Sequence, residues 1–98
     1  MKIIKNGNGD HLTIALDGRL DTFTSKDLEA ELRSSLNGIS CLEFDFEKLP
    51  YITSAGLRVI SVAQKIMNRQ GRLIIRNMQP DVLDVFRMTG LSDIMEIL

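Results

Sequence analysis

The feature that most limits the fold is a short run of small residues between a strand pattern and a helix pattern. Residues 51–57 read Tyr-Ile-Thr-Ser-Ala-Gly-Leu; a strand-like run at 41–46 precedes them and an amphipathic stretch at 57–70 follows. Backbone N–H groups at a helix start have no internal partners, and the helix dipole is positive there. A phosphate can be held at such a place, and Ser54 can carry one covalently.

Alternating hydrophobic periods along the chain predict the element order β-β-α-β-α-β-α-β. A hairpin is predicted from residues 3–4 and 12–16, with residues 17–18 ending its second strand. The remaining elements are expected as strands at 41–46, 73–75 and 94–98, a connector at 49–51, and helices at 24–36, 54–70 and 80–90. This order implies an α/β fold with a mixed sheet, parallel crossovers and helices mainly on one side.

The first helix has a sequence pattern typical of a capped start. Thr24 is the expected N-cap, with Asp27 at the third helical position. Phe23 and Leu28 are spaced as a hydrophobic staple, which predicts that both side chains are packed.

Composition predicts one soluble domain that spans residues 1–98. The chain is 44% apolar and 26% charged, with a formal net charge of −1, so no strong field draws it to nucleic acid or to an anionic membrane. The single Cys41 lies in an apolar strand, which predicts an inert core thiol and a reducing compartment. No apolar run approaches the length of a membrane span, so we expect a cytoplasmic protein.

The sequence lacks the residue sets that catalysis and metal binding need. His11 is the only histidine, so we expect no metal site, no cofactor and no catalytic triad around Ser54. Aromatic residues make up 5% of the chain, which argues against nucleic-acid binding by stacking. We therefore expect a protein that is not an enzyme.

Charge is unevenly distributed along the chain. Residues 48–80 contain no acidic residue and six basic ones, namely Lys48, Arg58, Lys65, Arg69, Arg72 and Arg76. This segment is either a solvated basic face or a docking surface for an acidic partner.

Local chemistry alone favours a structural role for the motif. Ser54 is a good helix cap, and Thr53 would serve equally well. Gly56 permits close packing of the helix start, although glycine costs about 1 kcal/mol in a helix interior.

The motif and several other segments resemble the STAS family. Residues 49–60 are similar to the signature of STAS domains and, more narrowly, to that of bacterial anti-sigma factor antagonists. Residues 18–21 (Gly-Arg-Leu-Asp), 42–46, 71–73 and 88–91 also fall where the family has similar residues. The resemblance covers essentially the whole chain and implies a STAS-like fold.

This resemblance implies a partner-switching mechanism. The unphosphorylated protein would bind an anti-sigma factor that is also a Ser/Thr kinase, and so free a sigma factor. The kinase would phosphorylate Ser54, or Thr53 as the alternative, and a metal-dependent phosphatase would reset the switch. Residues with a partner-binding or supporting role would be Asp21, Thr53, Ala55, Gly56 and Arg58.

The chain departs from the family pattern at two places. Many members carry Asp immediately before the phosphorylated serine, where this chain has Thr53, a second hydroxyl. Asp21 is the matching acidic residue of the earlier loop; it either positions the serine or the kinase's metal, or is simply a turn residue. The sequence also stops at Leu98, where many relatives continue into another helix, which predicts an exposed side of the sheet and weak self-association as a homodimer.

Two other functions fit a short STAS domain. One is a subunit of an inner-membrane lipid-transport complex, and the other is a signalling scaffold that is not phosphorylated. A phosphoacceptor-type residue at Ser54 favours the switch over the transport subunit.

Overall fold

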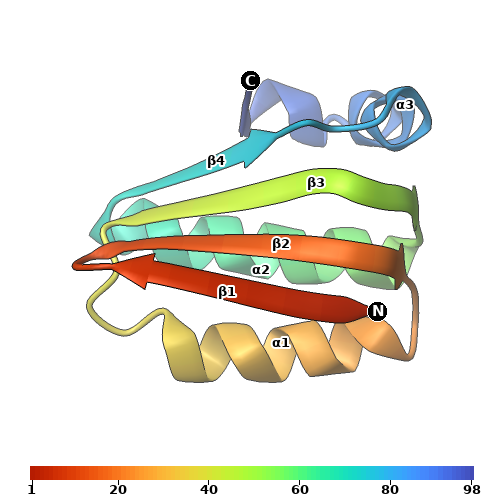
Figure 1. Ribbon diagram of the computed structural model, residues 1–98. Coiled ribbons are helices and arrows are strands. Elements are labelled where there is room, and N and C mark those ends of the chain that lie inside the picture. The colour runs from red at the N-terminus through yellow and green to blue at the C-terminus, as the bar shows by residue number, and fades with distance from the viewer.

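A five-stranded mixed sheet forms the centre of the protein, whose computed structural model describes residues 1–98 (Figure 1). The strands follow one another across the sheet in chain order, as β1 (Lys2–Asn8), β2 (His11–Leu20), β3 (Cys41–Ile52), β4 (Arg72–Arg76) and β5 (Glu96–Ile97). The first pair is antiparallel, and every later pair is parallel. The predicted mixed sheet is therefore confirmed.

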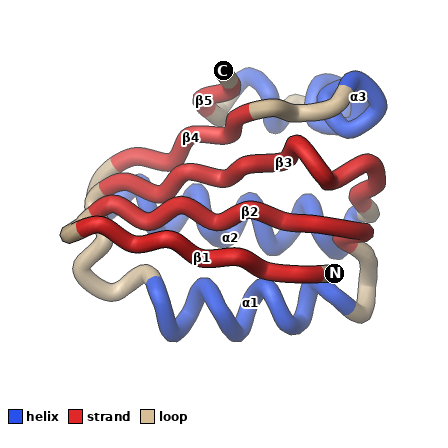
Figure 2. Tube along the Cα trace, viewed as in Figure 1, coloured by secondary structure: helices blue, strands red, loops and turns tan.

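Three helices and a short 3₁₀ turn connect the strands. They are α1 (Thr24–Ser35), α2 (Ser54–Gln70), α3 (Pro80–Met88) and η1 (Leu91–Asp93). α1 and α2 lie together behind the sheet, and α3 lies with the C-terminal segment beyond the end of β4 (Figures 1 and 2). Pro80 begins α3, as expected, because its missing N–H has no partner to lose at the first helical position.

One face of the sheet makes the hydrophobic core with these helices. Alternate residues of β2 and β3 are buried, so that side chains with a period of two point toward α1 and α2. The largest fully buried side chains include Phe44, Phe46, Phe86, Ile14, Leu28 and Ile60. The expected strand and helix periodicities thus meet in a single core.

Strand β3 is twice as long as expected, because two irregularities disturb its alternation. Ala15 of β2 pairs with Asp45 of β3, and Asp17 pairs with Lys48. Three residue steps of β3 therefore lie opposite two of β2, so β3 contains an extra residue here. The same happens again before Tyr51. Burial then recurs every three residues, and Pro50 is tolerated at the second irregularity, so the predicted connector at 49–51 is wrong.

Smaller differences concern the other strands. β2 continues through the Asp-Gly pair at 17–18 to Leu20, and β1 extends over seven residues. The last strand contains only Glu96 and Ile97.

The start of α1 also differs from the expected cap. Asp21, not Thr24, supplies the cap: its carboxylate accepts hydrogen bonds from the N–H groups of Phe23 (3.0 Å) and Thr24 (2.9 Å). In turn, the Thr24 hydroxyl oxygen accepts a hydrogen bond from the Asp21 N–H at 2.8 Å, which completes a reciprocal capping box. Phe23 is 80% exposed while Leu28 is buried, so the predicted staple is wrong.

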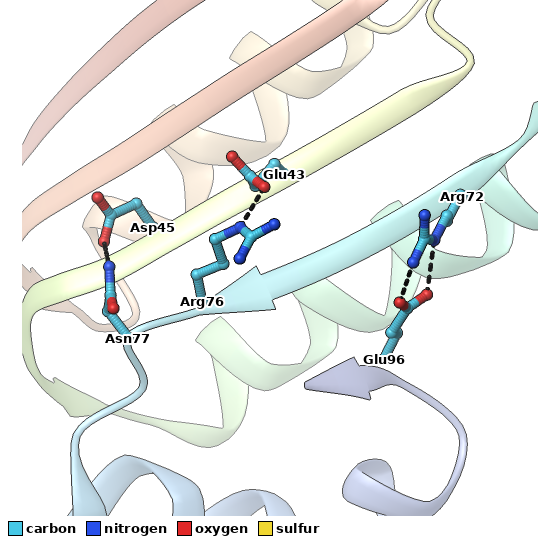
Figure 3. Close-up of polar contacts among 6 residues, drawn as sticks. All are labelled: Glu43, Asp45, Arg72, Arg76, Asn77 and Glu96. Atoms are coloured by element: carbon cyan, nitrogen blue, oxygen red, sulfur yellow. Dashed lines mark hydrogen bonds and ion pairs between the residues drawn. The ribbon is translucent and has the colours of Figure 1, made fainter. Parts of the chain in front are cut away.

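The opposite face of the sheet carries polar side chains in place of a helical cover. Arg76 pairs with Glu43, Arg72 with Glu96, and the Asn77 amide donates to Asp45 (Figure 3). Ile74 lies in register between Glu43 and Glu96 and is only 4% exposed, so these pairs shield it. Cys41 lies opposite Arg72 in register and is half-buried on this face, so the prediction of a core thiol is wrong.

The Arg72–Glu96 pair should make stability depend on pH. Its hydrogen bond lowers the pKa of the Glu96 carboxyl and raises the pKa of Arg72. The carboxyl of Glu96 binds its proton less readily in the folded than in the unfolded protein. The contribution of the pair to the free energy of unfolding is therefore present above roughly pH 4 and is lost as the pH falls through the folded pKa. We expect Glu96→Gln and Arg72→Gln to lower the urea midpoint slightly at pH 7 and less at pH 3. In the double variant, additive losses at pH 7 would contradict the pairing.

Candidate functional site

The motif lies at the edge of the sheet where two parallel strands end and two helices begin. The last residues of β2 and β3, Leu20 and Ile52, are paired in register. The Thr53 N–H donates to the Leu20 carbonyl at 3.0 Å, which ties the start of α2 to the end of β2. Figure 1 shows the starts of α1 and α2 at this same end of the sheet. Topology therefore brings the segments 21–24 and 51–57 together.

Thr53 occupies the N-cap position of α2 but makes no capping hydrogen bond with its side chain. Its backbone is extended (φ −104°, ψ 175°), and its hydroxyl lies 3.5 Å from the Leu20 carbonyl oxygen. Ser54 is then the first helical residue, and its side chain is exposed. The local expectation that Ser54 caps the helix is wrong. The first turn keeps its unpaired N–H groups, and Ser54 is exposed beside them.

Gly56 allows α2 to approach the strands more closely than any other residue would. A β-carbon at this position would lie 2.7 Å from Leu20 Cγ, 2.9 Å from Ile52 Cγ1 and 3.0 Å from the Leu20 carbonyl oxygen. Such distances do not occur without movement of the neighbours. The close packing expected from Gly56 is confirmed, and it fixes where the first turn of α2 sits.

Asp21 follows Leu20 directly and uses its carboxylate in its own turn. The backbone N–H of Thr24 is the largest cause of a lowered pKa at Asp21, with the Thr24 hydroxyl, the Phe23 N–H and the charge of Arg19 acting in the same direction. Asp21 is therefore ionised at neutral pH. Through these hydrogen bonds it shapes the loop next to the motif.

Charged and aromatic side chains surround the motif on the same edge. Arg58 is exposed one helical turn beyond Ser54, and a hollow of about 190 Å³ between α1 and α2 is lined by Lys26, Ala55 and Arg58 among others. The Arg19 guanidinium lies 4.0 Å from the centre of the Tyr51 ring, a cation–π contact, and Tyr51 is 42% exposed. With Phe23, these side chains give the edge an apolar component that suits a protein contact.

Sequence reasoning missed the contribution of Arg19 and Tyr51. The available signal was the parallel register, because the residues just before Leu20 and Ile52 must then lie side by side. The extra residues in β3 concealed that register.

The only histidine of the chain lies far from Ser54. His11 begins β2, and Leu20 ends it, so nine residue steps of about 3.3 Å put His11 roughly 30 Å from the motif edge. No group of three or more His, Cys, Asp or Glu residues lies close enough to hold a metal ion. No helix is long and apolar enough to cross a membrane.

Comparison with known proteins places this geometry in a family. The STAS domain model matches residues 2–98, so the chain belongs to the STAS domain family. The BtrV protein of Bordetella bronchiseptica is 32% identical over 99 residues, covering 99% of this chain and 85% of BtrV. The anti-sigma-B factor antagonist of Listeria monocytogenes is 31% identical over 97 residues, covering 96% of this chain and 84% of that protein.

Solved structures agree on the fold. An anti-sigma factor antagonist from Mycobacterium paratuberculosis superposes with a TM-score of 0.88 at 14% identity, covering 98% of this chain and 83% of that one. The phosphorylated form of the Bacillus cell fate determinant SpoIIAA superposes with a TM-score of 0.79 at 21% identity, covering 99% and 91%. The chain is a STAS domain protein related to anti-sigma factor antagonists.

The contact at Gly56 yields a stability prediction. Gly56→Ala should destabilise the fold by about 1–3 kcal/mol, because the clash with Leu20 and Ile52 outweighs the roughly 1 kcal/mol that alanine gains in a helix. Urea denaturation measures the change. Gly7→Ala is the matched control, since its β-carbon would lie 3.9 Å from Leu12 Cδ1, an ordinary contact. Equal stability of the two variants would show that the close approach is not needed.

Proposed function

We propose that this protein is an anti-sigma factor antagonist that phosphorylation of Ser54 switches off. The observation that carries the proposal is the exposed Ser54 side chain at the first position of α2, in a chain related to such antagonists. In the unphosphorylated state the motif edge binds an anti-sigma factor with Ser/Thr kinase activity and displaces a sigma factor. The protein is a substrate in this cycle and performs no catalysis.

The environment of Ser54 suits a phosphate without unfolding the monomer. A phosphoserine adds about −1.5 to −2 charges and three strong acceptor oxygens. The first turn of α2 contains no acidic residue, and its dipole favours negative charge. Arg58, at i+4, is on the same side of the helix and is free to pair with the phosphate.

The cost of phosphorylation therefore falls on the complex and not on the fold. A dianion placed in a fitted interface loses hydration and repels acidic groups of the partner. Thr53 and Ala55 form the contact surface around Ser54, buried Gly56 supports this surface by its close packing, and Asp21 and Arg58 flank it. A Ser/Thr phosphatase restores the binding form. Sigma factors act in the cytoplasm, so the proposal assigns the chain to that compartment.

Phosphorylation of the purified protein tests the assignment of the residue. The chain is incubated with ATP and the kinase-type anti-sigma factors of the same organism, and the peptide spanning Thr53 and Ser54 is sequenced by mass spectrometry. We expect one phosphate on Ser54, retained in Thr53→Val and lost in Ser54→Ala. Phosphate on Thr53 alone, or none with any of these kinases, would contradict the proposal.

A further inference from the structure

The exposed face of α2 is basic along its whole length. The helix contains no Asp or Glu, and its three cations, Arg58, Lys65 and Arg69, are all exposed. They occupy positions i, i+7 and i+11, which at 100° per residue fall within about 20° of one line along the helix. At 1.5 Å per residue, this line is about 16 Å long, or three turns.

None of these three cations is in an ion pair with an acidic residue of the chain. The five ion pairs of the chain involve Lys5, Arg33, Arg72, Arg76 and Arg87, and none involves a residue of α2. Glu29 lines the same hollow as Arg58, but its carboxylate pairs with Arg33. α2 therefore carries three positive charges outside any ion pair, although the net charge of the protein is −1.

An apolar strip lies next to this line of charge. Val62 and Ile66, one turn apart, are only partly buried. Together with Lys65, Arg69 and Gln70 they line a shallow hollow of about 380 Å³. The surface thus combines an apolar floor with a basic rim. We call Arg58, Val62, Lys65, Ile66 and Arg69 the α2 stripe.

We propose that the α2 stripe docks an acidic amphipathic helix of a protein partner. Such a helix would place apolar side chains one turn apart on Val62 and Ile66, and carboxylates opposite the three cations. This inference deepens the proposed function and rests on it in one respect, namely that the docked helix belongs to the partner that reads Ser54. Ser54 is at i−4 from Arg58, so the stripe continues directly into the motif edge.

Other anionic ligands suit the α2 stripe less well. A membrane-bound amphipathic helix inserts its large apolar face into lipid, whereas the apolar face of α2 is buried in the core through Leu57, Ile60 and Met67. Single-stranded nucleic acid needs aromatic side chains for stacking, and α2 has none. An acidic protein helix matches both the charge and the narrow apolar strip.

A defined probe tests the α2 stripe without knowledge of the natural partner. The probe is a fluorescein-labelled amphipathic peptide of about 18 residues with Leu on one face and Glu on the flanks. Its binding to the full chain is measured by anisotropy, and its location by ¹⁵N–¹H chemical-shift changes. Lys65→Glu/Arg69→Glu is the test variant. Lys2→Glu/Lys48→Glu is the matched control, because it changes the net charge equally at exposed positions outside α2 that are in no ion pair.

We expect saturable binding, with shift changes concentrated in residues 58–70. The test variant should bind about tenfold more weakly, and the control should change less than twofold. Equal weakening in both variants, or no saturable binding, would overturn the proposal. Tighter binding of an oligodeoxythymidine or of phosphatidylglycerol vesicles to the stripe would also overturn it. So would a homodimer, seen by sedimentation, that the test variant abolishes.

The phosphorylation switch can be tested independently of the α2 stripe. Ser54→Ala should leave binding of the peptide unchanged while it removes phosphorylation. Peptide binding without phosphorylation would therefore retain the α2 stripe and reject the switch, and phosphorylation without peptide binding would do the reverse.

Discussion

The contact between the start of α2 and the end of β2 controls the position of the candidate site. The Thr53 N–H is held by the Leu20 carbonyl, and the missing side chain of Gly56 lets the helix lie against Leu20 and Ile52. Because both strands end in register, this single contact also sets the loop of Asp21 beside the motif. In this packing Gly56 lies against the strands, while Ser54 is exposed.

The two faces of the sheet are stabilised in different ways. The face covered by α1 and α2 supplies the apolar core, whereas the other is held by cross-strand polar pairs such as Arg72 with Glu96. The surface that we propose for recognition lies at the motif edge and along α2. Its character is basic and partly aromatic, in a protein with almost no net charge.

Most of the fold was predictable because apolar residues recur every second position in the strands and every three to four positions in the helices. Residue-level errors arose where that periodicity is locally broken or where two cap geometries compete. The extra residues in β3 interrupt the alternation beyond Phe46, so the rest of that strand was not predicted. At α1, the side chain of Asp21 makes the capping hydrogen bond that was expected from Thr24. At the site, local chemistry favoured Ser54 as a cap, while the family resemblance favoured an exposed serine, as the structure has it. The pairing of Arg19 with Tyr51 needed the register, which periodicity alone does not supply.

The most direct test compares the affinity of the partner for the two forms of this protein. Calorimetric titration of a kinase-type anti-sigma factor that phosphorylates Ser54 into the unmodified and the fully phosphorylated chain gives both dissociation constants. We expect phosphorylation to weaken binding several-hundred-fold, which corresponds to about 3–4 kcal/mol. Equal dissociation constants for the two forms would contradict the view that the exposed hydroxyl of Ser54 governs the contact.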